Sequence, residues 1–170
     1  MKISTRYVFD QAGYQIIPGT KDSYAAINPQ TIVQACKSKQ EAEKWAHEKE
    51  AIKGIVNSLG RSVVSMPEDK GVNSKGQPNS DLLMLYVFNK AEVKNLLNAV
   101  NPKKAVKDHL REARKQNCQE VFIVLRLNED LAEAINGYKR YTGVPENQSN
   151  RFDKGRCVFF IDGVVVWQSE

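Results

Sequence analysis

The feature that most constrains the fold is a run of five apolar residues, Val121–Leu125, that lies between two helical patterns. A run this short and this rich in β-forming residues predicts a central strand buried on both faces. The helical pattern before it spans residues 103–117, and the one after it begins at Asn128 or Asp130 and continues to about Tyr141. Strands that alternate with helices along the chain predict an α/β fold, a mixed β-sheet flanked by helices.

The N-terminal region predicts an antiparallel hairpin, because two β-prone runs, Tyr7–Phe9 and Tyr14–Ile17, are separated by turn-forming residues. A long helix is then expected over 38–59. Ser38 and Glu41 have the spacing of a capping box at its start.

Three further strands are expected between this helix and the basic helix. Residues 61–66 form one, and residues 82–88 and 91–96 form two more, joined by a turn at Asn89-Lys90. Near the C-terminus, Asp162-Gly163 between two apolar runs predicts a β-hairpin.

The length of 170 residues predicts a single domain. It divides into an N-terminal extension (1–37), a core (38–127) and a C-terminal helix with its hairpin (128–170). No apolar run is long enough to span a bilayer, and the N-terminus lacks the pattern of a secretory signal. We therefore expect a cytoplasmic site of action, with any export occurring as part of a larger protein.

Cysteine and histidine are scarce. The three cysteines, Cys36, Cys118 and Cys157, are widely spaced and form no C-x-x-C pair, so neither a disulfide framework nor a zinc site is expected. The two histidines are too few for a histidine-rich metal site. Any metal would be held by carboxylates, which favours Mg²⁺ or Mn²⁺.

The segment that carries chemistry runs from Asp81 to Lys94. Asp81 begins an apolar strand, and the next strand carries Glu92 and Lys94 two residues apart. Side chains alternate along a strand, so Glu92 and Lys94 share a face. Two carboxylates can bind a hard cation beside a phosphodiester, and a lysine can stabilise the charge that develops on it. An exposed strand with a solvated Glu-Lys pair would give the same short motif.

In series with its neighbours, this segment resembles the PD-(D/E)xK nuclease superfamily. The resemblance covers roughly residues 48–125 and is carried by the stretch 50–68, by N79-S-D81, by A-E92-V-K94 and by L110-R-E-A-R-K-Q116. More narrowly, the chain is similar to the tRNA nuclease C-terminal toxin domains of contact-dependent growth inhibition proteins. It departs from the pattern at Asn79-Ser80, where proline often precedes the aspartate.

The resemblance implies a restriction-endonuclease-like core in which Asp81 and Glu92 ligate the metal and Lys94 is the catalytic lysine. It also implies a further acid on the first helix, for which Glu50 is the candidate and Glu48 competes. Glu68 would match an acid at the edge of the site.

Basic residues follow the motif on the helix 103–117. The residues of this helix that are expected to contact phosphate are Lys107, Arg111, Arg114, Lys115 and the neutral Gln116. A solvated helix face is the common alternative. Arg151, Lys154 and Arg156 are weaker candidates. Tyr138, Tyr141 and Trp167 are candidates for stacking on unpaired bases, with core packing as the alternative.

The function expected from the sequence is a Mg²⁺- or Mn²⁺-dependent endonuclease, with tRNA favoured as substrate and an immunity protein as partner. The net charge of +5 and the pI near 9.1 permit a polyanionic partner. The immunity protein is expected to be acidic, because the predicted active-site surface is basic. Two alternatives stay open: a DNA endonuclease of a phage or mobile element, and a non-catalytic nucleic-acid- or protein-binding module with the same fold.

Overall fold

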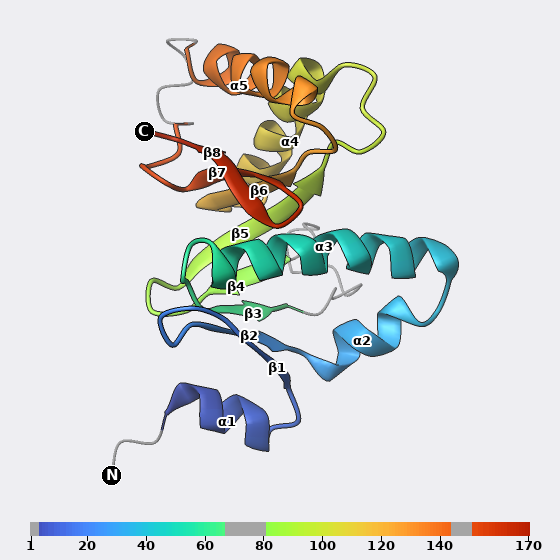
Figure 1. The fold of residues 1–170 in the computed structure, drawn as a ribbon, viewed down its shortest axis with the longest axis vertical. Coiled ribbons are helices and arrows are strands. Elements are labelled where there is room, and N and C mark those ends of the chain that lie inside the picture. The colour runs from blue at the N-terminus through green and yellow to red at the C-terminus, as the bar shows by residue number, and fades with distance from the viewer. Residues whose placement is uncertain (1–3, 67–80, 144–150) are drawn as a thin grey trace.

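The computed structural model describes residues 4–66, 81–143 and 151–170 (Figure 1). Within these residues, five helices and eight strands alternate along the chain. In chain order they are α1 (Thr5–Gln11), β1 (Gln15–Pro18), β2 (Tyr24–Ile27), α2 (Pro29–Ala35), α3 (Lys39–Asn57), β3 (Val63–Ser65), β4 (Leu82–Met84), β5 (Asn89–Asn95), α4 (Pro102–Lys115), β6 (Glu120–Val124), α5 (Glu129–Thr142), β7 (Cys157–Ile161) and β8 (Val164–Gln168). The prediction of an α/β fold with a mixed sheet is confirmed.

The strands form one sheet whose spatial order follows the chain, from β1 to β8. Neighbours pair antiparallel at β1–β2, β3–β4, β4–β5 and β7–β8, and parallel at β2–β3, β5–β6 and β6–β7. Each parallel pair needs a crossover. The pair α2 and α3 connects β2 to β3, α4 connects β5 to β6, and α5 connects β6 to β7.

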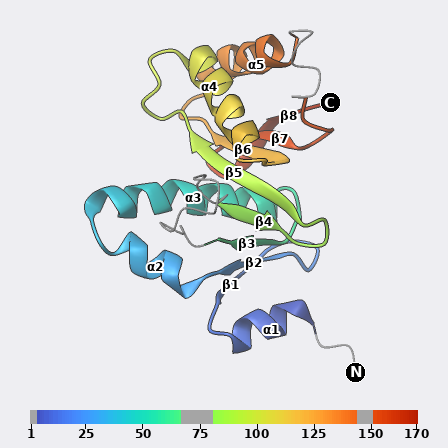
Figure 2. The same cartoon turned by 180° about the vertical axis from the view of Figure 1, so that it is seen from behind.

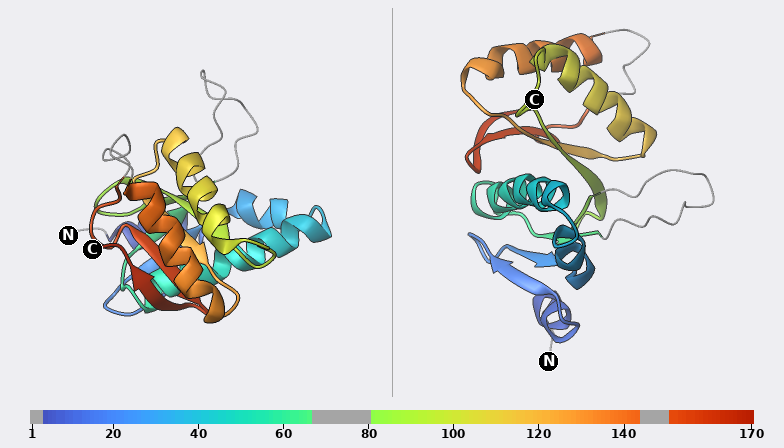
Figure 3. Two further views of the ribbon diagram at one scale, coloured as in Figure 1. Left: turned by 90° about the horizontal axis from the view of Figure 1, so that it is seen from above. Right: turned by 90° about the vertical axis from the view of Figure 1, so that its right-hand side faces the viewer.

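Alternate strand residues point to opposite faces of the sheet. Different helices cover the two faces. On one face, Ile55 of α3 belongs to the same apolar cluster as Phe160 of β7. On the other face α4 and α5 pack over Val121 and Phe159. There, too, α1 packs over β2 and β3 through Phe9. The right-hand view in Figure 3 shows α4 and α5 at one end, α1 at the other and α3 between them, and the left-hand view looks down from the α5 end.

Two expected elements have the predicted character. Every residue of β6 is buried, as expected for a central strand. The long helix α3 begins after Ser38, whose Oγ accepts a hydrogen bond from the backbone N–H of Glu41 at 3.1 Å. No helix among the described residues is both long and apolar enough to cross a bilayer.

The predicted hairpin between Tyr7–Phe9 and Tyr14–Ile17 is wrong. Residues Tyr7–Phe9 lie within α1, and β1 pairs with β2 instead. Phe9 packs inward, with its ring 5.0 Å from that of Tyr14, whereas Tyr7 and Val8 are exposed. Packing of this one inward ring overrides the β propensity of the three residues, which depends strongly on context.

The predicted turn at Asn89-Lys90 is also wrong, because both residues open β5. The side-chain amide of Asn89 donates to Glu120 at 2.8 Å, and the backbone N–H of Lys90 donates to the side chain of Gln119 at 2.8 Å. These bonds attach the start of β5 to β6 and shift the turn towards β4.

The turn itself consists of Leu85–Phe88. Tyr86 has a φ of 70° and Phe88 a φ of 54°. The left-handed region is uncommon for residues other than glycine, asparagine and aspartate, and it gave no signal in the local sequence.

On the C-terminal side of the molecule, β7 and β8 pair antiparallel around Asp162 and Gly163.

Candidate active site

The candidate active site forms where the sheet opens between β4 and β5. These strands pair from Met84 with Asn89 to Leu82 with Ala91, after which β5 continues along β6 as far as Asn95. Figure 2 shows β5 running from the β4–β5 turn towards α4. Glu92 and Lys94 lie in the part of β5 beyond its pairing with β4, so side chains from other elements can approach them.

Asp81 closes the opening on the β4 side. It directly precedes β4, and its Oδ2 accepts a hydrogen bond from the backbone N–H of Val93 at 2.9 Å. Its carbonyl oxygen accepts another from the N–H of Met66 at 2.8 Å. The first bond fixes the Asp81 carboxylate beside the strand that carries Glu92 and Lys94.

Glu92 and Lys94 form an ion pair on the face covered by α4. The Nζ of Lys94 lies 2.7 Å from Oε1 of Glu92 and 3.6 Å from Oε2 of Glu112. With its amide nitrogen facing the carboxylate, Gln116 donates to Oε2 of Glu92 at 2.6 Å. Glu112 and Gln116 are one helical turn apart, so a single face of α4 positions both functional residues of β5.

Glu48, and not Glu50, is the glutamate of α3 that lies at this site. Glu48 lines the same pocket as Asp81 and Glu92, whereas Glu50 lines a separate groove near Gly163. Residues two apart on a helix point in widely different directions. The spacing Trp45, Glu48, Ile52, Ile55 places Glu48 on the inward stripe of α3, so helix phase alone distinguishes the two acids.

These groups surround a pocket of about 410 Å³. It is lined by Lys44, His47, Glu48, Asp81, Glu92, Val93, Lys94, Asn95 and His109. Both histidines of the chain are in this set. The pocket therefore combines three acids with two lysines and two imidazoles, contributed by α3, β5, α4 and the residue that precedes β4.

Burial raises the pKa of all three acids, and the charge of Asp81 raises the pKa of the two glutamates further. Burial, followed by the charge of Asp81, raises the pKa of Glu48 to about 8. The same two causes raise the pKa of Glu92 to about 7, against the opposing charge of Lys94. Burial also raises the pKa of Asp81, although the hydrogen bond from Val93 opposes it. A cation placed among these carboxylates would relieve the repulsion.

The basic groups respond to the same surroundings. Burial lowers the pKa of Lys94, but the charges of Glu92, Asp81 and Glu112 outweigh it, so the net shift is upward. Burial and the charge of Lys94 lower the pKa of His109. Lys94 is thus charged at neutral pH, whereas the lowered pKa of His109 favours its neutral imidazole.

The basic residues of α4 have different surroundings. Lys107 and Lys115 are exposed, and Arg111 is exposed with Asp108 3.4 Å away. Arg114 is engaged within the protein, where it donates to the carbonyl oxygen of Arg151 and lies 4.0 Å from the ring of Phe152.

Two other sets of sequence candidates are placed as follows. The rings of Tyr138, Tyr141 and Trp167 pack in the cluster beneath α4 and α5, so core packing accounts for them. Of the weaker basic candidates, Arg156 pairs with Glu120, and Arg151 and Lys154 are exposed. Glu68, Asn79 and Ser80 lie outside the described residues.

Sequence reasoning missed Glu112, His109, His47 and Lys44. A signal for the first two was present: His109, Glu112 and Gln116 recur at three and four residues beside the apolar stripe of α4. Polar residues next to an inward stripe are candidates for a site that the helix covers. Their partners on β5 could not be inferred without the three-dimensional packing.

The donor set fits a hard divalent cation better than a soft one, because its oxygens are carboxylates. As the side chains lie, no group of three or more His, Cys, Asp or Glu residues within 4–66, 81–143 and 151–170 could hold a metal ion. Mg²⁺ commonly uses only one or two protein carboxylates, with water and substrate phosphate completing its coordination. Asp81 and Glu92 could supply those two.

Comparison of the chain with protein-family models, with curated proteins and with solved structures gives no match.

Proposed function

We propose that this chain is a Mg²⁺- or Mn²⁺-dependent nuclease that hydrolyses phosphodiester bonds in nucleic acid, with tRNA as its favoured substrate. The observation that carries this proposal is the meeting of Glu48, Asp81, Glu92 and Lys94 in one pocket, where the sheet opens between β4 and β5. Carboxylates that can hold a divalent cation, beside a lysine that can stabilise negative charge, suit metal-assisted phosphodiester hydrolysis.

The order of elements supports the proposal. A helix bearing an acid (α3) is followed by β3, by β4 with Asp81 at its start, by β5 with Glu92 and Lys94, and by α4 ending near Gln116. This is the order that the resemblance to PD-(D/E)xK nucleases implies for a restriction-endonuclease-like core.

Each residue has a role that follows from its position. Asp81 and Glu92 would hold the cation, which when bound neutralises phosphate charge and lowers the pKa of the attacking water. Lys94, kept charged by its acidic neighbours, would stabilise negative charge on the phosphorus oxygens. Glu48 would orient the water or accept its proton, since burial and Asp81 set its pKa near neutral pH. Gln116 would keep the Glu92 carboxylate aligned.

The biological setting that goes with this chemistry is a toxin domain acting in the cytoplasm and delivered as part of a larger protein. Its cognate immunity protein would be acidic, because the chain carries a net charge of +5.

The decisive experiment incubates the purified protein with total tRNA, plasmid DNA and single-stranded DNA, each with Mg²⁺, Mn²⁺ or EDTA. We expect cleavage that requires a metal and that falls by about a hundredfold or more in Lys94→Ala. Cleavage of DNA alone would favour the DNA endonuclease instead. If the folded protein cuts none of these substrates, the binding-module alternative is correct.

Two glutamates of α3 provide a matched pair for the same assay. Glu48→Gln should remove most activity, because the variant loses a carboxylate at the pocket. Glu50→Gln alters the same helix and the same charge, but outside the pocket, and should cut normally. Equal loss in both variants would contradict the assignment of Glu48.

A further inference from the structure

The β4–β5 turn presents two aromatic rings to solvent. Tyr86 is 71% exposed and Phe88 is 74% exposed, and Val87 between them is also exposed. Large rings that are this exposed and adjacent are unusual on a soluble surface and commonly mark a contact site. The other aromatic candidates, Tyr138, Tyr141 and Trp167, are packed inside, so the turn is a distinct aromatic surface.

The turn is anchored on both sides. At its first residue, the backbone N–H of Leu85 donates to the carbonyl oxygen of Ser62 at 2.9 Å. After it, the side chain of Asn89 donates to the buried carboxylate of Glu120. Tyr86 and Phe88 both adopt the left-handed backbone conformation. The rings are thus held outward by a fixed backbone and not by a loose loop.

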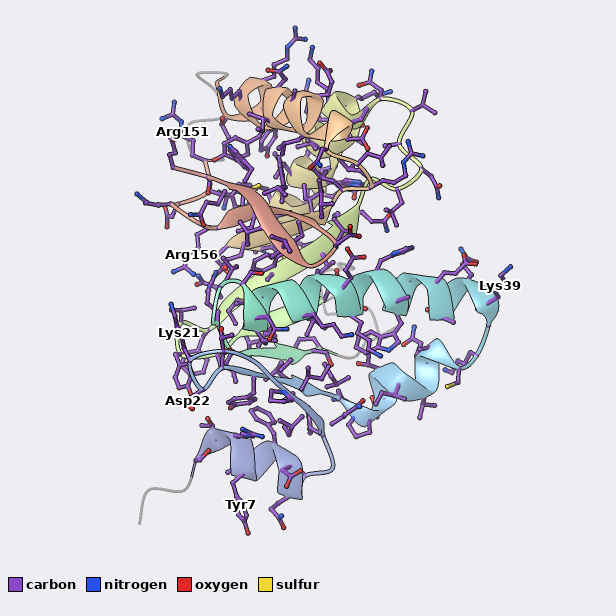
Figure 4. The ribbon with its side chains drawn as sticks, in the orientation of Figure 1. Tyr7, Lys21, Asp22, Lys39, Arg151 and Arg156 are labelled. Carbon is purple, nitrogen blue, oxygen red and sulfur yellow. The ribbon has the colours of Figure 1, made fainter. Side chains whose placement is uncertain are left out.

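The charges beside the turn are mainly positive. Glu120, which holds Asn89, also receives Arg61 at 2.7 Å and Arg156 at 2.5 Å. Two cations meet one carboxylate, so the cluster keeps a net positive charge, and both arginines are about a quarter exposed. In Figure 4, Arg156 and Lys21 lie on the side of the molecule where Figure 1 places this turn, with Asp22 next to Lys21.

A lysine connects the turn with the pocket. Lys90 is exposed and lies two residues before Glu92 on β5, so alternation places it on the same face as Glu92 and Lys94. At about 3.3 Å per strand residue, Lys90 lies about 7 Å from Glu92 and the turn about 13 Å. The rings of the turn are therefore followed along β5 by Lys90, and then by Glu92 and Lys94.

We propose that the Tyr86–Phe88 turn is a binding surface for unpaired nucleotides, with the bases stacked on Tyr86 and Phe88 and the phosphates beside Lys90. Aromatic rings bordered by cations match the two chemical features of single-stranded nucleic acid, base faces and a polyanionic backbone. A purely apolar protein partner would not use the surrounding positive charge. The choice of nucleic acid as partner rests on the proposed nuclease function, and the binding itself does not require catalysis.

The test measures fluorescence anisotropy of labelled oligouridylate and oligothymidylate strands, and of a duplex, in EDTA. We expect single strands to bind the wild-type protein more tightly than the duplex. The double variant Tyr86→Leu/Phe88→Leu should bind single strands about tenfold or more weakly, because leucine keeps apolar bulk but has no ring face. The ring-preserving pair Tyr86→Phe/Phe88→Tyr should bind within about threefold of wild type.

Tyr7→Leu is the matched control, since Tyr7 is a 56% exposed aromatic residue on α1 that points away from the turn (Figure 4). It should bind like wild type. Unchanged binding by the double leucine variant would overturn the proposal, and so would the absence of any binding to single strands. Either result would assign the turn to an apolar protein contact. Turn-dependent binding without cleavage would defeat the nuclease proposal alone, whereas cleavage with an unchanged KM in the double leucine variant would defeat this one alone.

Discussion

At the scale of residues, the three acids of the pocket determine how stability depends on pH. The pKa of Glu48 is raised to about 8 and that of Glu92 to about 7, so the folded protein holds protons that the unfolded chain has already released. Stability from these groups is present below the ordinary pKa of glutamate and is lost as pH rises through the folded values. Burial lowers the pKa of His109. Below about pH 6.5 this histidine therefore makes the stability of the fold rise with pH.

The metal-free protein should therefore become less stable between about pH 7 and 8.5, where His109 is largely neutral in both states and the acids still titrate. Thermal unfolding in EDTA across this range measures the slope. Glu48→Gln should flatten it, because one of the protons involved is removed. Adding Mg²⁺ at the upper end should restore stability by binding the native state. Stability that stays constant or rises with pH would contradict this account of the pocket.

At the scale of elements, the position of α3 depends on a glycine. A Cβ built on Gly54 would lie 2.6 Å from Cδ1 and Cε1 of Phe160 in β7. Because the ring is fully buried, it has little room to move. This close approach holds α3 against the sheet, and Glu48 is on the same helix.

Gly54→Ala should lower the free energy of unfolding by about 1–3 kcal/mol through overpacking, in spite of the better helix propensity of alanine. Chemical denaturation measures the change. Lys53→Ala, at the exposed neighbouring position, should change it by less than about 0.5 kcal/mol. A stabilised Gly54→Ala protein would show that α3 can move away from β7 without cost.

The β4–β5 turn carries backbone strain, since its two aromatic residues occupy a conformation suited to asparagine or glycine. Phe88→Asn should raise the free energy of unfolding by about 0.5–1 kcal/mol. Val87→Asn is the control, because Val87 has no positive φ and should gain nothing. Denaturation that shows no gain in Phe88→Asn would mean that contacts of the ring offset the strain.

The elements that the sequence predicted correctly are those whose own residues fix them. The N-cap of α3, the apolar run of β6 and the stripe of α4 are local patterns, fixed by residues close together in the sequence. The helix α1 and the β4–β5 turn were mispredicted because distant contacts decide them. Phe9 packs near β2, and Asn89 bonds to β6.

At the scale of the whole molecule, the same distinction applies to the site. Glu92 and Lys94 could be placed on one face from the sequence, because side chains alternate along a strand. Whether Asp81 lies beside them depends on the register of β4 and β5, which the sequence left open. Glu48 could be favoured over Glu50 by the phase of α3. The contacts of Glu112 and Gln116 with β5 depend on how α4 crosses the sheet, which no short-range pattern specifies.

The strand order, in which every strand lies beside the one that precedes it in the chain, also has a consequence for how the protein is made. A polypeptide that emerges N-terminus first from a ribosome or through a narrow channel can add each new strand to one already in place. Asp81 and Glu92 would appear about midway, with β4 and β5, whereas Gln116 emerges later with the end of α4. A partly emerged chain would therefore hold the acids without Gln116, and the cleavage that we propose would begin only after α4 has emerged.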